Sequence, residues 1–91
     1  MTEIKWEQID ENNYTAQVGT VTLCCKLVDV KGQEYSSWQP TVHLCINGSI
    51  MSNHATHAMS LDIAKHRCVI LARVMLDETV KRAEANRRLL D

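Results

Sequence analysis

The 91-residue chain has little of what several classes of protein require. It contains no Phe, two Trp and two Tyr, so aliphatic and sulfur-containing side chains must fill most of its core. Its formal net charge is −1, which leaves no overall positive field to attract nucleic acid. No stretch reaches the roughly 18 to 20 apolar residues of a membrane-spanning helix. These absences favour one small globular domain, residues 1–91, over a membrane protein or a strongly basic one.

Residues that form active sites are also scarce. With three Gly in total, the chain can form few of the tight loops that active sites favour, and it has no phosphate-binding Gly motif. Cys45 beside His43 is the one local pairing of a nucleophile with a base, and nothing near it predicts an oxyanion hole. We therefore expect that the protein is not an enzyme and uses no cofactor.

Four Cys and four His raise the possibility of a metal site. Zinc needs three or four converging ligands, and the chain has no Cys-x-x-Cys pair. Cys24 and Cys25 are adjacent, so on a strand they point to opposite faces. We predict no metal site, although His54, His57 and His66 lie close in sequence. The N-terminus lacks the pattern of a secretory signal, so we expect reduced thiols and a cytoplasmic location, in the host cytoplasm if the chain is phage-encoded.

Alternating apolar and polar residues predict two hairpins. In the first, strands within 13–30 are joined at Gly19-Thr20, where Gly at the first central position suits a type II′ turn. A two-residue loop pairs Val18 with Val21 and puts the apolar residues of both strands on one face. The second hairpin, residues 40–53, turns at Asn47-Gly48, a strong type I′ signal that places Leu44 opposite Met51.

The segments around the hairpins are less regular. Residues 4–9 read either as a strand or as an irregular lead-in, and 10–13 as a turn. Residues 31–39 are predicted to be a polar connection that carries Tyr35 and Trp38. Pro40 lacks an N–H donor and fits the beginning of a strand.

A helix is predicted from Ser60 to Leu90, because this run contains no Gly or Pro and is rich in good helix formers. Ser60 is its expected N-cap. About 30 residues at a 1.5 Å rise give roughly 45 Å of helix, more than a small sheet can cover. The sequence therefore predicts an α+β fold, with a four-stranded antiparallel β-meander followed by one long C-terminal helix packed on one face.

The helix carries more apolar surface than one sheet can bury. One stripe is predicted to face the sheet and contains Leu61, Ala64, Cys68, Leu71, Ala72 and Met75. Val69, Leu76 and Val80 form a third flank, and a second stripe nearly opposite the first contains Ile63, Ile70 and Val74. Leaving three large aliphatic residues in water forgoes roughly 1.5 to 3 kcal/mol each. We therefore predict a homodimer in which two helices meet along Ile63, Ile70 and Val74. The alternative is that the segment around Ile4 and Trp6 folds over them.

Several features recur in a fixed order along the chain. They are Trp6, the strand from Tyr14 to Gly19, Trp38, the Asn47-Gly48 turn and the helix start from Ser60 to Lys65. Their order resembles that of many small bacterial and phage open reading frames, a resemblance that implies no particular chemistry. The order of strands followed by a helix is also similar to that of transcriptional coactivators that bind single-stranded DNA as dimers.

The surplus apolar surface favours a protein-interaction module, and the phage-like order suggests an inhibitor or accessory factor that docks on a larger host protein complex. Interface hot spots are enriched in Trp, Tyr and Arg. We predict contacts from Tyr35, Trp38 and Arg73, with Arg87 and Arg88 at the rim. Trp38 has an alternative role as a lid on its own core. The competing function is a dimer that binds single-stranded nucleic acid, using Lys81, Arg82, Arg87 and Arg88.

Overall fold

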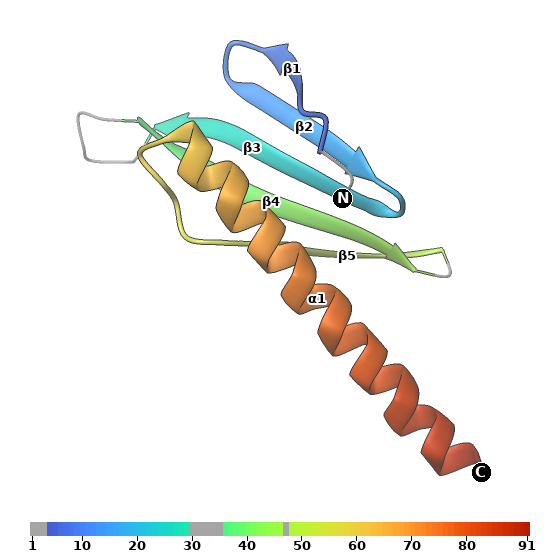
Figure 1. Cartoon of the computed structure of the whole chain (residues 1–91). Coiled ribbons are helices and arrows are strands. Elements are labelled where there is room, and N and C mark those ends of the chain that lie inside the picture. The colour runs from blue at the N-terminus through green and yellow to red at the C-terminus, as the bar shows by residue number, and fades with distance from the viewer. Residues whose placement is uncertain (1–3, 30–35, 47) are drawn as a thin grey trace.

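Five antiparallel strands and one helix form an α+β fold in the computed structural model, which describes residues 4–29, 36–46 and 48–91. The elements are β1 (Glu7–Asp10), β2 (Asn13–Val18), β3 (Val21–Asp29), β4 (Ser36–Ile46), β5 (Ser49–His54) and α1 (Leu61–Leu90). The strands lie in the sheet in chain order, from β1 at one edge to β5 at the other. The helix crosses one face of this sheet and continues beyond it (Figure 1).

The predicted number of strands is wrong, because the sheet has five strands and not four. The additional strand is β1, in which Glu7 pairs with Thr15 and the register shifts between Gln8 and Asp10. Its four residues are all exposed, so β1 is too short and too polar to show alternation. The turn that follows is held by Asp10, whose Oδ1 accepts the backbone N–H of Asn12 at 2.8 Å. This bond lowers the pKa of the Asp10 carboxyl.

The first hairpin has the predicted register. Val18 pairs with Val21 and Tyr14 with Cys25, and Gly19 has the positive φ of +60° that the first position of its turn requires. Leu44 also lies opposite Met51, as predicted for the second hairpin. In the turn of this second hairpin, Gly48 has a φ of +81°. Asn47, the other turn residue, lies outside the described residues.

The prediction that residues up to Gln39 form a loop is wrong, because β4 begins at Ser36 and Pro40 is inside it. Trp38 exchanges two backbone hydrogen bonds with Ala58, at 2.7 and 2.9 Å, and the Pro40 carbonyl accepts the Ala55 N–H at 3.0 Å. Thr41 pairs with His54, so one extra residue lies between His54 and Ala58 opposite Pro40. A residue with an N–H at position 40 would direct it at this bulge, where the regular ladder is interrupted. Proline at this position therefore costs the sheet no hydrogen bond.

The core lies between the helix and the sheet face that it covers. Small residues on α1 let the two approach closely. The predicted sheet-facing stripe is confirmed, since Ala64, Cys68, Ala72 and Met75 are buried. The Cys68 thiol lies 3.7 Å from the Cys25 thiol on β3. Hydrogen bonding to Cys68, together with burial, raises the pKa of the Cys25 thiol above its ordinary value.

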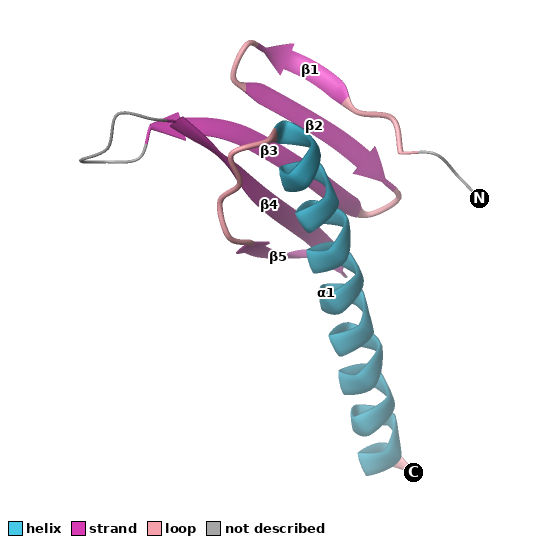
Figure 2. Ribbon diagram, turned by 60° about the vertical axis from the view of Figure 1, so that its left-hand side comes forward, coloured by secondary structure: helices cyan, strands magenta, loops and turns pink. Residues whose placement is uncertain are grey.

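The helix starts and ends as predicted, but only half of it is packed. Ser60 is in the N-cap position and its carbonyl accepts the Ala64 N–H at 3.0 Å, although its side chain makes no capping bond. Beyond Met75 every residue is exposed except Thr79, which is half-buried. The chain therefore measures 56 × 30 × 23 Å, and its long axis is extended by the projecting helix (Figure 2). Within the described residues, no helix is long and apolar enough to cross a membrane.

Candidate interaction surface

The second helix stripe is open in the structure. Ile63, Ile70 and Val74 are 49%, 45% and 46% exposed. The N-terminal segment does not cover them, since Ile4 lies beside Val69 on the opposite flank of α1. Trp6 is also on that flank, with its ring 5.4 Å from the Lys65 ammonium. The part of the chain that the structure describes therefore leaves this stripe available for a partner.

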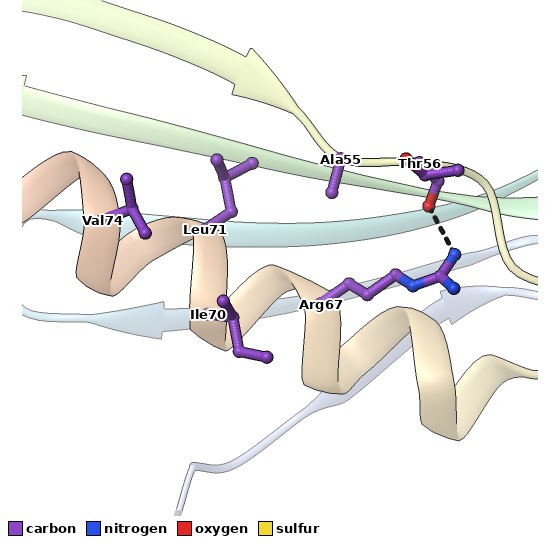
Figure 3. A pocket seen from close by; sticks show the side chains of 6 residues that line it. All are labelled: Ala55, Thr56, Arg67, Ile70, Leu71 and Val74. Carbon is purple, nitrogen blue, oxygen red and sulfur yellow. Dashed lines mark hydrogen bonds between the residues drawn. The ribbon is translucent and has the colours of Figure 1, made fainter.

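A groove of about 380 Å³ lies beside this stripe, between α1 and the segment that follows β5. Ala55 and Thr56 form one side, and four helix residues form the other (Figure 3). The helix residues are Arg67, Ile70, Leu71 and Val74. Apart from Thr56 and Arg67 the lining side chains are apolar, so the groove suits an apolar occupant.

Arg67 fixes the shape of this groove. Its Nη1 donates to the carbonyl oxygens of Thr56, at 3.0 Å, and His57, at 2.7 Å. The segment between β5 and α1 is thereby tied to the first half of the helix. Ser37 Oγ lies 3.1 Å from His57 Nδ1, which holds the same segment against β4. The groove therefore has two anchored walls before any partner binds.

The strand next to the groove is an open edge. All six residues of β5 are exposed, and the sheet has no strand beyond it among the described residues. On β4, Trp38 and Pro40 point their backbone hydrogen-bonding groups toward the β5 side, and by alternation Val42 and Leu44 do the same. Their partners on β5, Asn53 and Met51, therefore point their own backbone groups toward β4. The backbone groups of Ile50 and Ser52 therefore point outward, where a further strand would pair with them.

The residues predicted to contact a partner do not form one surface. Trp38 is half-buried against the core and meets the Tyr14 ring edge-on, with centroids 5.7 Å apart. This packing favours the lid alternative for Trp38. Arg73, Arg87 and Arg88 are exposed on α1, the last two in its projecting half, and Tyr35 lies outside the described residues. The groove residues Ala55, Thr56, Arg67 and Leu71 were missed as contact residues, since only folding brings the segment after β5 to the helix.

Among the described residues, the sheet face opposite the helix carries no Trp or Tyr ring. Trp6, Tyr14 and Trp38 all lie on the covered side, where they pack against the core. Cys24 lies on the open face, with its Sγ 3.7 Å from Thr15 Oγ1. In the described ranges no group of three His, Cys, Asp or Glu side chains could hold a metal ion.

His43 and Cys45 share the open face, as expected, but the hydrogen bond of His43 goes elsewhere. Its Nδ1 lies 2.6 Å from Ser52 Oγ on β5. Cys45 is exposed at the end of β4. Neither His43 nor Ser52 lines the groove beside α1, so their pair has no adjoining substrate pocket there.

Comparison of the chain with protein-family models, with curated proteins and with solved structures finds no match.

Proposed function

We propose that the protein is an interaction module that docks on a larger protein by accepting an extended apolar segment of it. The observation that carries the proposal is the position of the anchored groove next to the open edge of β5. A strand added to β5 would form main-chain bonds with Ile50 and Ser52. Its alternate side chains would point to the helix side of the sheet, toward Ile70 and Val74. Backbone pairing with β5 and burial of apolar side chains in the groove thus both favour an extended apolar segment.

We assign Ile70 and Val74 to this protein partner and not to a second copy of the chain. The stripe is short, because the next positions on the same flank of α1 are Asp77 and Lys81. Two helices meeting along Ile63, Ile70 and Val74 would share only about three turns. An extended segment needs no more than this length. In this proposal the protein acts in the cytoplasm as an inhibitor or accessory factor of a host complex.

Two observations favour protein docking over binding of single-stranded nucleic acid. Base stacking uses exposed aromatic rings, whereas the described aromatic side chains lie on the covered side of the sheet. The basic residues Lys81, Arg82, Arg87 and Arg88 are also balanced. They share residues 77–91 with the acidic residues Asp77, Glu78, Glu84 and Asp91.

The test is affinity capture from nuclease-treated host lysate with matched variants. Ile70→Asp places a charge in the groove, and Ile50→Pro removes an outward N–H from β5 without breaking its ladder to β4. Ile9→Asp is the control, since Ile9 is 60% exposed on the opposite edge strand, β1. We expect the wild type and Ile9→Asp to capture the same protein, and both other variants to lose at least tenfold in affinity for it.

Equal capture by Ile70→Asp would contradict the groove, and equal capture by Ile50→Pro would contradict strand addition. Salt-sensitive binding of purified protein to single-stranded DNA is a different outcome. If it disappears when Lys81, Arg82, Arg87 and Arg88 are neutralised, the nucleic-acid function replaces the docking function.

A further inference from the structure

Beyond Leu76, the second half of α1 packs against no other element among the described residues. The residues from Leu76 to Leu90 extend past the sheet, and only Thr79 among them is even half-buried (Figures 1 and 2). They span roughly 22 Å at 1.5 Å per residue. The packed half supplies the nucleus from which this half continues as a helix. Its large apolar side chains Val80, Leu89 and Leu90 stay exposed, and contact with a partner would remove them from water.

This projecting half carries a regular apolar seam. Alternating steps of four and three residues connect Val69, Arg73, Leu76, Val80, Ala83, Arg87 and Leu90, which we call the seam. This is the 3.5-residue spacing by which helices pair in coiled coils. Leu76, Val80 and Leu90 are 40%, 56% and 88% exposed. The seam is separate from the Ile63, Ile70 and Val74 stripe, which ends where the projecting half begins.

At its other end the seam enters a second groove. This groove, of about 230 Å³, lies between α1 and the β2–β3 hairpin on the side away from β5. Val69, Arg73 and Leu76 line it from the helix, and Ile4 and Val18 line it from the N-terminal part of the chain. Val18 is 44% exposed there. One molecule thus offers an apolar groove at one end of the seam and an unpacked helix at the other.

We propose that a second copy of this chain covers the seam, with the two helices antiparallel and related by a twofold axis. In this arrangement each projecting half lies in the second groove of the other copy. A single twofold contact then fills the second groove and packs the projecting half in both copies, because each copy contributes the same surface. The dimer uses the flank of α1 opposite the docking groove, so it is independent of the proposed function.

Arg73 and Arg87 favour the antiparallel orientation of the two helices over the parallel one. In an antiparallel pair centred between Leu76 and Val80, each Leu76 faces Val80 of the second copy. Arg73 then faces the small Ala83, and Arg87 faces Val69, so each aliphatic stem packs while its charge reaches solvent at the side. A parallel pair in register would instead set Arg73 against Arg73 and Arg87 against Arg87. Like charges placed opposite one another in a seam disfavour that pairing.

The first measurement is the mass in solution at tens of micromolar, by light scattering. We expect twice the chain mass of 10.3 kDa. Val80→Asp should reduce it to the monomer mass while the β-sheet signal is retained. Lys81→Asp is the matched control, since Lys81 is the next residue but lies on another flank. Ile70→Asp should remain a dimer. A monomeric wild type, or a dimer broken by Ile70→Asp and kept by Val80→Asp, would overturn the proposal.

The second measurement gives the orientation. Arg73→Cys and Ala83→Cys are made as separate chains in a Cys24→Ser, Cys45→Ser background and oxidised with diamide, which takes up the two electrons and two protons of each thiol pair. The antiparallel seam predicts a disulfide only when the two chains are mixed. A disulfide within either chain preparation alone would indicate the parallel pair. Capture of a different helical protein along the seam, with no self-association, would also overturn the second copy as its occupant.

Discussion

The two halves of α1 have similar helical character and opposite surroundings. The helix has 30 residues, and its buried residues, Ala64, Cys68, Ala72 and Met75, all lie before Leu76. Three of these four are small, which brings the helix backbone close to β3 and β4. On the same flank the second half has the polar residues Thr79, Arg82 and Asn86. Local propensity is sufficient to continue a helix, but only side-chain size and polarity determine where it packs.

The largest effect is expected from matched Ala→Asp substitutions in the two halves. Ala64 is 0% exposed, so Ala64→Asp buries an unpaired carboxylate, at a loss of roughly 3 to 5 kcal/mol in the free energy of unfolding. We expect Ala64→Asp to unfold the domain. Ala83→Asp should leave the monomer fold intact and only weaken self-association. Circular dichroism and urea titration at low protein concentration measure both, and equal destabilisation would remove the distinction between the halves.

A smaller loss is expected at Trp38, which supports the sheet face under the packed half. Its ring packs against the core and meets Tyr14 edge-on. Because the side chain is only half-buried, Trp38→Ala should lower the free energy of unfolding by about 2 to 4 kcal/mol, near the low end for core aromatics. At roughly 4 to 8 °C per kcal/mol for a domain of this size, calorimetry should show a fall of about 8 °C or more in Tm. An unchanged Tm with lost partner capture would instead make Trp38 a contact residue.

The smallest effect concerns pH and the thiol pair beneath the packed half. The pKa of Cys25 is raised in the folded chain, so the native thiol stays protonated where the unfolded one, near 9.0, ionises. The unfolded state then binds fewer protons, and stability falls as pH rises above about 9, by at most roughly 1.4 kcal/mol per pH unit. Because the two buried thiols titrate as a pair, replacing both Cys25 and Cys68 by Ala should remove this part of the slope. Denaturant titrations between pH 8 and about 10.5 compare the two, and parallel curves would contradict the assignment.

Local patterns were informative wherever two strands are joined by a short turn. Gly19-Thr20 and the alternation around it predict the pairing of Val18 with Val21, because a two-residue loop leaves one register that buries both apolar sets. The sequence left residues 4–9 as either a strand or an irregular lead-in, because the exposed residues of β1 carry no alternation and its pairing with β2 is irregular. The early start of β4 was missed because Trp38 pairs with Ala58, a partner twenty residues away, across a bulge that accommodates Pro40.

The candidate site shows the same division. The open stripe of Ile63, Ile70 and Val74 follows from helical periodicity, and the structure leaves it exposed. The groove beside it depends on Arg67, which reaches two carbonyl groups about ten residues earlier in the chain. No local pattern indicates such a bond, because the two carbonyl groups lie outside the helix and approach Arg67 only in the folded chain. The predicted contacts at Trp38 and Arg73 therefore fall on different parts of the molecule.

By itself the sequence determined the helix, its apolar stripes and the registers of two hairpins, since each depends on neighbours within a few residues. Only the tertiary structure decided which half of α1 is packed, where the N-terminal segment lies and how the segment after β5 forms a groove. These outcomes depend on the width of the assembled sheet and on contacts between distant side chains. Residues such as Ile4 and Arg67 acquire their partners when the helix settles on β3 and β4, and nothing in their local sequence specifies those partners.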